Sequence, residues 1–339
     1  MRDRSIIELL SPAKNLACAK AAILAGADTV YMGAAAFGAR SNATNSLQDL
    51  KEAANFAHDF GARLYVALNT ILSDDELSEA KKLANLAYEA GADALIIQDL
   101  GLISDDLPPI EIHASTQCDI RTPEKARFLE SAGFDTLVLA RELSLSEISA
   151  ISKSVKARIE CFVHGALCVS MSGKCYLSYA VGGRSGNRGM CAQPCRMKYE
   201  LLDADFKKVA KDSYFLSLKD LNRSQSIGEM LDANVSAFKI EGRLKDEDYV
   251  KNVTAFYRKI LDIEIAKRGL KRASFGESKL SFTPDPTKTF NRGFTEYFLH
   301  SNQTGNASFN TPKSRGEYIG VAFPIGVTVN DERSSSAIC

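Results

Sequence analysis

The stretch Ala90-Gly91-Ala92-Asp93-Ala94-Leu95-Ile96-Ile97-Gln98 joins the end of a helical segment to a short aliphatic run. Similar junctions recur around Gly26, Gly61 and Gly133, and each again leads from a helix-like segment into a β-branched or aliphatic run. Glycine is the usual residue just past the C-terminus of a helix, and a short apolar run is typical of a buried strand. Each unit is therefore predicted to contain one helix and one strand.

Eight apolar runs of this kind occur before residue 242. They are Ile7–Leu10, Thr29–Gly33, Arg63–Asn69, Ala94–Gln98, Ile110–Ala114, Thr136–Ala140, Arg158–His164 and Ala237–Glu241. Near-continuous apolar strands that alternate with helices form parallel sheets covered on both faces. Eight such units in about 250 residues are typical of a TIM-type (β/α)8 barrel, the α/β fold that we predict. A doubly wound open sheet is the alternative, but no glycine-rich dinucleotide fingerprint follows the first strand.

The repeat is interrupted once, between His164 and Ala237. This segment is rich in glycine and arginine and carries half of the eight cysteines. A long connection without a regular pattern is typical of a functional loop in a compact domain. We therefore predict a barrel domain over residues 1–270 that includes a cysteine-rich insertion over residues 165–215.

The character of the sequence changes again beyond residue 270. Phe282-Thr283-Pro284-Asp285-Pro286 and Gly316-Glu317-Tyr318-Ile319-Gly320-Val321 are typical of turns and strands. Few strand-like segments follow before Cys339, whereas an independently stable β unit needs three or more strands. We expect residues 271–339 to be the start of a small β domain that is truncated.

The composition is that of an ordinary globular protein. The 339 residues are 45% hydrophobic and 25% charged, and 42 Lys and Arg balance 42 Asp and Glu. These values exclude a disordered, collagen-like or globally basic protein, although not a local basic patch. The N-terminus holds only a short apolar run, and no stretch approaches the ~18 apolar residues of a membrane helix. We expect a cytoplasmic protein without a membrane anchor.

The insertion contains a cluster of four cysteines, Cys168, Cys175, Cys191 and Cys195, within 28 residues. A reducing cytoplasm disfavours disulfides, so clustered thiolates there bind a soft metal or an iron–sulfur cluster. The spacings of six and fifteen residues differ from the two to four residues between paired zinc ligands. We therefore favour an iron–sulfur cluster, with zinc and metal-free thiols as alternatives. Three other cysteines are expected to be small core residues: Cys18, Cys118 and Cys161.

Polar residues follow nearly every predicted strand, at the end of the barrel where TIM barrels perform their chemistry. Two histidines and two glutamates there suit proton transfer: His113, Glu142, His164 and Glu241. Five further side chains are expected to bind the substrate: Asn69, Asp99, Arg141, Lys239 and Arg243. The cations among them suit a carboxylate or a phosphate. The alternative is that the histidines are buried structural residues and that the cations pair with the glutamates.

Several longer motifs extend this picture. They are Phe162-Val163-His164-Gly165-Ala166-Leu167-Cys168, Ser172-Gly173-Lys174-Cys175, Gly189-Met190-Cys191-Ala192-Gln193-Pro194-Cys195-Arg196 and Lys239-Ile240-Glu241-Gly242-Arg243. Together they resemble the collagenase-like peptidase family, in which several members resemble RNA or quinone hydroxylation factors. Three more motifs are similar to the branch that hydroxylates ribosomal RNA: His113-Ala114-Ser115-Thr116-Gln117, Gly183-Arg184-Ser185-Gly186-Asn187-Arg188-Gly189 and Leu216-Ser217-Leu218-Lys219-Asp220.

The resemblance implies that a cytidine of large-subunit ribosomal RNA, or of its precursor, is converted to 5-hydroxycytidine without molecular oxygen. It further implies prephenate as the hydroxyl donor and a [4Fe–4S] cluster on Cys168, Cys175, Cys191 and Cys195. Some family members place a cysteine where this chain has Asn222. Members of this branch also continue past residue 339, so a missing C-terminal part is expected to weaken RNA binding.

Arg184 and Arg188 lie close to the cysteines in the sequence and are expected to bind RNA. The alternative is that they neutralise a negatively charged cluster. Two other functional classes are weighed against RNA hydroxylation, namely a peptidase and a non-catalytic iron–sulfur scaffold. The sequence has no H-E-x-x-H and no G-x-S-x-G motif. The acidic residues at the barrel mouth argue against a scaffold.

Overall fold

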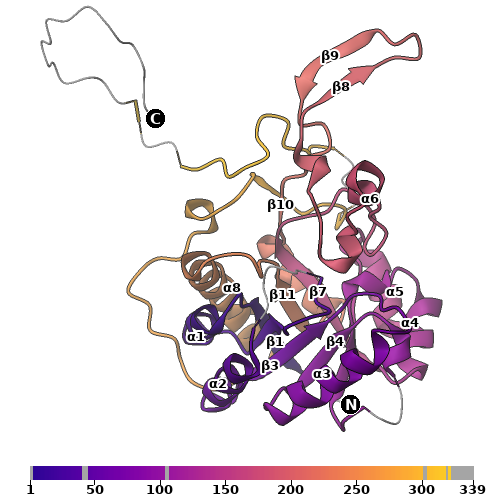
Figure 1. Ribbon diagram of the computed structural model, residues 1–339. Coiled ribbons are helices and arrows are strands. Elements are labelled where there is room, and N and C mark those ends of the chain that lie inside the picture. The colour runs from indigo at the N-terminus through magenta and orange to yellow at the C-terminus, as the bar shows by residue number, and fades with distance from the viewer. Residues whose placement is uncertain (1–2, 40–44, 104–106, 301–303, 318–319, 322–339) are drawn as a thin grey trace, which may run out of the picture.

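The computed structural model describes residues 3–39, 45–103, 107–300, 304–317 and 320–321. Its centre is a barrel of eight parallel strands (Figure 1). They are β1 (Ile6–Pro12), β2 (Thr29–Gly33), β3 (Arg63–Leu68), β4 (Ala94–Ile97), β5 (Glu111–Ala114), β6 (Thr136–Val138), β7 (Arg158–Gly165) and β11 (Ala237–Ile240). Neighbours along this order pair in parallel, and β11 pairs with both β7 and β1. The predicted TIM-type barrel is confirmed, because this closure excludes the open sheet.

Helices cover the outside of the barrel. They are α1 (Leu16–Leu24), α2 (Leu47–His58), α3 (Leu77–Glu89), α4 (Pro123–Ser131), α5 (Leu145–Ser154), α7 (Ile227–Asp232) and α8 (Glu247–Arg268). Between β4 and β5 the described residues contain only a 3₁₀ turn, Leu100–Leu102. Pro108 and Pro109 precede β5 there, and proline disfavours helix at the residue before it. No described helix is long and apolar enough to cross a membrane.

The glycine junctions end helices as predicted. Their φ angles are all positive, at 101°, 62°, 96° and 103° for Gly26, Gly61, Gly91 and Gly133. This left-handed conformation is strained for residues with a Cβ atom. The chain therefore turns from helix to strand at these glycines.

Aspartates that follow three of these glycines tie neighbouring strands together. Each carboxylate accepts a hydrogen bond from a backbone N–H group of the preceding strand. The pairs are Asp28 with Leu9 at 2.8 Å, Asp93 with Leu64 at 2.8 Å and Asp135 with Ile112 at 3.2 Å. The repeated motif thus fixes β1, β3 and β5 next to β2, β4 and β6 at the bottom of the barrel.

The insertion rises from one end of the barrel (Figure 1). It contains α6 (Leu177–Gly182), the 3₁₀ turns Gly186–Arg188 and Pro194–Arg196, the hairpin of β8 (Tyr199–Leu202) and β9 (Lys208–Ser213), and β10 (Asp220–Asn222). The hairpin projects away from the barrel, whereas β10 returns and pairs antiparallel with β7. The segment with the four cysteines is therefore held over the C-terminal ends of the barrel strands.

The described residues after Leu270 extend existing structure. Strand β12 (Lys271–Arg272) pairs with β1, and β13 (Phe294–Thr295) pairs with β10. A 3₁₀ turn, Pro286–Lys288, lies between them. The strand expected at residues 316–321 falls partly outside the described residues, and the division into two domains stays a prediction.

Candidate functional site

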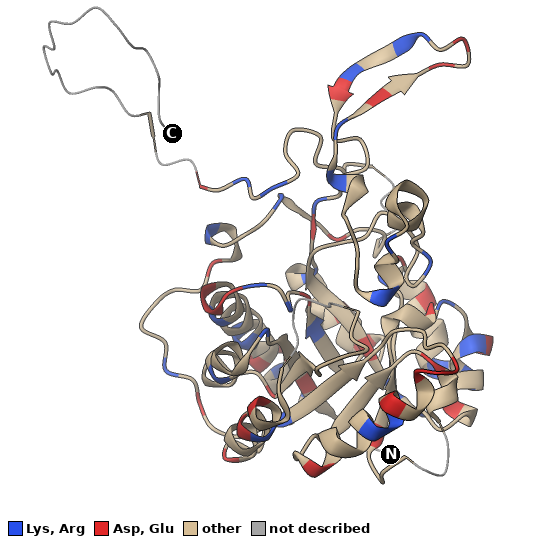
Figure 2. Cartoon of the chain, viewed as in Figure 1, with Lys and Arg blue, Asp and Glu red and all other residues tan. Residues whose placement is uncertain are grey.

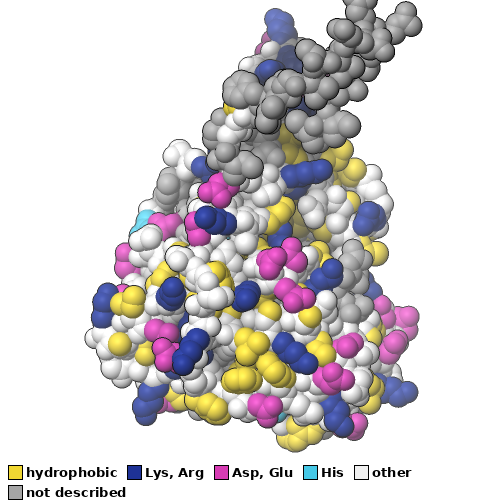
Figure 3. Space-filling model, turned by 90° about the vertical axis from the view of Figure 1, so that its left-hand side faces the viewer, with side chains coloured by type: hydrophobic (Ala, Val, Ile, Leu, Met, Phe, Trp, Pro, Cys, Tyr) yellow, Lys and Arg dark blue, Asp and Glu magenta, His cyan; other side chains and the backbone are white. Residues whose placement is uncertain are grey.

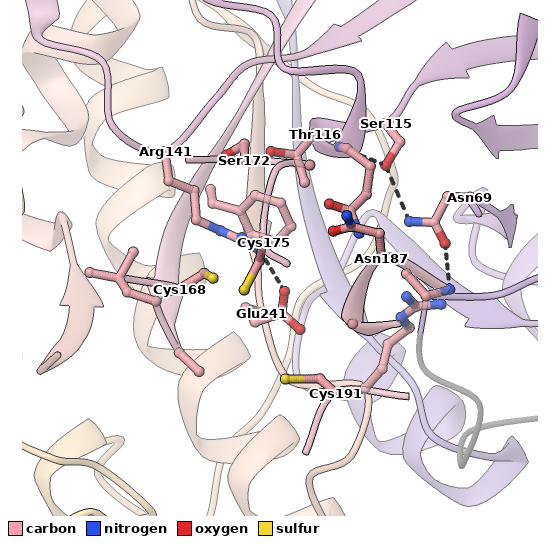
Figure 4. A pocket seen from close by; sticks show the side chains of 18 of the residues that line it. Asn69, Ser115, Thr116, Arg141, Cys168, Ser172, Cys175, Asn187, Cys191 and Glu241 are labelled. Atoms are coloured by element: carbon pink, nitrogen blue, oxygen red, sulfur yellow. Dashed lines mark hydrogen bonds and ion pairs between the residues drawn. The ribbon is translucent and has the colours of Figure 1, made fainter. Parts of the chain in front are cut away.

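A cavity of about 380 Å³ opens where the strand ends meet the insertion. The strand ends contribute polar side chains, among them Asn69, Ser115, Arg141, Lys239 and Glu241. The insertion contributes all four clustered cysteines, Cys168, Cys175, Cys191 and Cys195. A volume of this size is typical of small-molecule sites. Figure 4 shows the thiols of three of these cysteines around the pair of Arg141 and Glu241.

The four thiols form one group in space. Cys168 interacts directly with Cys175, and Cys195 lies within electrostatic range of both Cys168 and Cys191. Burial raises the pKa of the Cys168 and Cys195 thiols above the usual range. The four cysteines that cluster in the sequence thus also lie together in space, at the mouth of the barrel.

The four thiols of the cavity wall are the ligand type that both zinc and iron–sulfur clusters take. A zinc ion holds each sulfur about 2.3 Å from one point. Within the described ranges, no group of three or more His, Cys, Asp or Glu side chains is arranged to hold such an ion. An iron–sulfur cluster is a larger body that takes one thiolate on each of several irons. Four thiols around a cavity leave space for it.

Cations outnumber acids on the remaining wall of the cavity. Six of the described lining residues are cationic and one is acidic: Arg141, Arg196, Lys239, Arg243, Lys245 and Arg292 against Glu241. Three cations have a carboxylate partner: Arg141 with Glu241 at 2.6 Å, Lys239 with Glu160 at 2.6 Å and Arg292 with Asp220 at 2.9 Å. The excess positive charge favours an anionic ligand.

Lys245 is a cation whose pKa is shifted. Its Nζ lies 3.0 Å from the centroid of the Phe290 ring. Burial, together with the neighbouring Arg292 guanidinium, lowers the pKa of Lys245 to about 8, against the attraction of Asp220, Asp246 and Glu241. The Lys245 ammonium therefore loses its charge in mildly alkaline solution.

The family model of peptidase family U32 matches residues 14–308. This chain belongs to peptidase family U32. The U32 chain is 52% identical over 315 residues to the 23S rRNA 5-hydroxycytidine synthase of Escherichia coli (strain K12). The aligned region covers 93% of this chain and 48% of that protein. The chain thus spans about half the length of this relative. The resemblance noted in the sequence is confirmed.

Two further relatives of the U32 chain carry different names. A tRNA hydroxylation protein of Bacillus subtilis (strain 168) is 38% identical over 268 residues, with 75% of this chain and 63% of that protein covered. A collagenase of Porphyromonas gingivalis (strain ATCC BAA-308 / W83) is 33% identical over 311 residues, with 86% and 73% covered. The family therefore includes proteins named for RNA hydroxylation and proteins named for proteolysis.

Five of the non-cysteine residues predicted for the site line the cavity of the U32 chain: Asn69, Arg141, Lys239, Glu241 and Arg243. Asn69 accepts a hydrogen bond from the Ala39 N–H group at 3.0 Å and donates one to Ser115 Oγ at 3.1 Å. Arg243 is buried, and its guanidinium lies 5.9 Å from the centroid of the Tyr31 ring. These residues lie with the cysteines at one site.

The two histidines are not among the residues that line this cavity. His113 is buried inside the barrel, with its ring 4.6 Å from that of Tyr65. His164 packs against α8, where its Nδ1 lies 3.3 Å from the Tyr257 hydroxyl. The register between β7 and β11 shifts beside His164, so its ring does not follow Phe162 into the cavity. Burial lowers the pKa of His164 to about 3, which keeps it neutral.

Two acids assigned to the site instead fix nearby loops. Glu142 accepts hydrogen bonds from the backbone N–H and the hydroxyl of Ser172, at 2.8 and 2.9 Å. Asp99 accepts from the N–H groups of Leu72 and Gly101, both at 2.9 Å. Neither acid is among the residues that line the cavity. An acid at a strand end caps neighbouring backbone as readily as it faces the cavity.

The two arginines predicted to bind RNA also lie outside the cavity. Arg184 is exposed at the surface. Arg188 pairs with Glu76 and donates to the Ile71 carbonyl at 2.6 Å. Arg188 therefore fastens the insertion to the loop before α3.

Lys245 and Arg292 were missed by sequence reasoning. Lys245 follows the Lys239-Ile240-Glu241-Gly242-Arg243 motif by two residues, so the density of cations was an available signal. Arg292 lies far along the chain, and the pairing of β13 with β10, together with its ion pair to Asp220, brings it to the cavity. The three cysteines expected in the core are buried, as predicted: Cys18, Cys118 and Cys161.

Proposed function

We propose that this chain forms the catalytic part of an RNA hydroxylase that converts a cytidine of large-subunit ribosomal RNA to 5-hydroxycytidine. The observation that carries the proposal is the 52% identity to the 23S rRNA 5-hydroxycytidine synthase over 93% of the chain. That relative is named for cytidine 2501, and we propose the equivalent nucleotide as the substrate. The relative named for tRNA hydroxylation supports the same chemistry.

The reaction needs groups that amino acids do not supply. Replacing the C5 hydrogen by a hydroxyl oxidises the base by two electrons and adds one oxygen atom. No side chain carries a transferable oxygen, so a cofactor and a co-substrate must provide the hard chemistry. We propose an oxygen-independent reaction in which prephenate releases its hydroxyl group as it loses carbon dioxide and becomes aromatic, and this hydroxyl replaces the C5 hydrogen, which leaves as a proton. A [4Fe–4S] cluster on Cys168, Cys175, Cys191 and Cys195 would pass the two electrons removed from the base to an external electron acceptor.

The side chains of the cavity bind and orient the reactants in this proposal. Arg243, Lys245 and Arg292 provide cationic groups for the carboxylates of prephenate. The C5 proton must leave when the C–O bond forms. Glu241 is the carboxylate among the described lining residues, and the proposal makes it the proton acceptor. Its ion pair with Arg141 at 2.6 Å holds it in place.

The test is deletion of the gene in its host, followed by nuclease digestion and mass spectrometry of the ribosomal RNA. One cytidine should lose the mass of one oxygen atom. The wild-type gene and a Cys18→Ala variant should restore that mass, because Cys18 is buried away from the cavity. A Cys191→Ala variant should not. Unchanged ribosomal RNA in the deletion strain would refute the proposal.

A peptidase is the second candidate, because the family and one relative carry that name. Nucleophilic proteolysis needs a histidine or another base beside a serine, threonine or cysteine. In the described part of the chain, the polar partners of the four histidines are of other types: Asp93 for His58, Glu111 for His113, Tyr257 for His164, and Glu229 with Glu296 for His300. Two results together would favour this second candidate. The purified protein would cleave gelatin or casein, and deletion of the gene would leave the mass of the ribosomal RNA unchanged.

A further inference from the structure

The part of the insertion that covers the cavity has a one-sided charge. Residues 166–198 contain five cations and no Asp or Glu, although the charges of the whole chain balance. Lys174 and Arg188 reach out of the segment to Asp119 and Glu76. Arg184 and Lys198 remain exposed. In Figure 2 this side of the molecule carries blue segments beside the tan helix α6.

Two aromatic rings are exposed on the same segment. The exposed fractions of Tyr176 and Tyr179 are 66% and 63%. They are three residues apart at the start of α6, so their side chains lie on one face. Ser178 between them is buried and accepts a hydrogen bond from the Ala192 N–H group at 3.0 Å. The buried side of the helix is thus hydrogen-bonded to the segment that follows Cys191, and both rings are exposed to solvent.

The segment that carries these two rings adjoins residues that line the cavity. Tyr176 follows Cys175, which lines the cavity, and the chain returns to the lining at Gly186 and Asn187 after Arg184. A base that enters a cavity of this kind must leave its stack, and its neighbours then lose stacking partners. Aromatic side chains replace that stacking in proteins that bind single-stranded RNA.

We propose that Tyr176 and Tyr179 form a stacking platform for unpaired RNA bases next to the reacting nucleotide, with Arg184 on the phosphate backbone. The inference rests on the proposed function, because it takes RNA as the substrate. Other surfaces suit RNA less. The β8–β9 hairpin carries acids at Glu200 and Asp212, and Figure 3 shows cations and acids interspersed over another face.

The test is binding of a fluorescein-labelled single-stranded RNA of about twelve uridine and cytidine residues, measured by fluorescence anisotropy at several salt concentrations. Replacing both tyrosines, as Tyr176→Leu with Tyr179→Leu, should raise the dissociation constant at least about tenfold. The slope of affinity against salt should not change. Tyr176→Phe with Tyr179→Phe keeps both rings and should bind like the wild type. Tyr88→Leu, on α3 and 42% exposed, is the matched control and should have no effect.

Arg184→Gln tests the phosphate contact separately. It should reduce the salt slope by about 0.7, the value for one phosphate on a single strand. Unchanged affinity in the double leucine variant overturns the platform, as does an equal loss in the phenylalanine variant or no binding by the wild type. The deletion experiment decides the proposed function independently. If ribosomal RNA is hydroxylated while the leucine variant binds normally, the function stands and the platform fails.

Discussion

We expect the charge of a single lysine to make anion binding in this cavity depend on pH. Lys245 contacts the Phe290 ring, and burial lowers its pKa to about 8. A lysine is charged below its pKa, so the positive charge is present at pH 7 and lost as pH rises through about 8. The affinity for prephenate should therefore fall between pH 7 and pH 9. Isothermal titration calorimetry with prephenate across this range measures the fall.

Two substitutions at this position separate charge from packing. Lys245→Arg keeps a cation whose own pKa is far above this range, so the fall near pH 8 should disappear while binding persists. Lys245→Met should bind weakly at every pH. If the wild type and Lys245→Met show the same pH profile, another group controls binding.

Glu241 is the residue whose charge the proposed chemistry uses. Glu241→Gln keeps nearly the same volume and removes the proton acceptor, so the hydroxylation rate should fall about 10²- to 10⁴-fold. The fold and the iron content should stay intact, as circular dichroism and iron analysis would show. The comparison is His164→Gln, because His164 is buried against α8. This variant should have a lower free energy of unfolding, whereas the folded protein should keep its hydroxylation rate. Full activity in Glu241→Gln protein would remove the carboxylate from the mechanism.

The positions of individual side chains were only partly predictable. Periodicity placed strand ends correctly, so Asn69, Arg141 and Glu241 fall on the cavity. It did not reveal the direction of each side chain. The register shift beside His164 and the backbone hydrogen bonds of Glu142 are set by tertiary contacts, and no local pattern signals them.

At the scale of elements, the cysteine insertion should bind iron. Protein purified without oxygen should be brown and contain about four irons and four sulfides per chain. Cys191→Ala should lose most of this iron, because Cys191 lines the cavity and is exposed, so its loss leaves the core intact. Cys118→Ala, at a buried cysteine outside the cavity, should keep it. Colourless protein with stoichiometric zinc would contradict the assignment.

The helix-to-strand junctions allow a matched test of backbone strain. Gly26 and Gly133 have nearly equal φ angles of 101° and 103°. A Cβ at Gly26 would lie 2.6 Å from Arg258 Cγ, whereas a Cβ at Gly133 would have no atom within 4 Å. Gly133→Ala should lower the free energy of unfolding by about 1–2 kcal/mol through strain alone. Gly26→Ala should lower the free energy of unfolding by more than Gly133→Ala does. Urea titration measures the free energy of unfolding of both variants. Equal losses would show that Arg258 moves aside without cost.

The repeated junction made the whole barrel predictable, because it signals the same local event at each turn. All eight predicted strands are present, and the pairing of β11 with β1 follows from closing a sheet of eight such units. The balanced charge of the whole chain did not reveal the excess of positive charge at the cavity. Six of the described lining residues there are cationic and one is acidic. This local excess arises because residues far apart in the sequence, such as Arg292, meet at the cavity. The overall composition of the chain contains no information about such meetings.

The barrel closes within this chain, and the cysteines and cations lie on it together. The chain nevertheless spans 48% of the E. coli relative. If the other half of that relative contributes affinity for RNA and not reacting groups, this chain should hydroxylate the same nucleotide at a lower level. Expression in an E. coli K12 strain without the relative tests this, with mass spectrometry of the fragment around cytidine 2501. We expect partial modification, rising with the amount of protein, because weak binding is overcome by concentration. Complete absence of the mark in cells that contain the folded, iron-loaded chain would mean that a group required for the chemistry lies outside it.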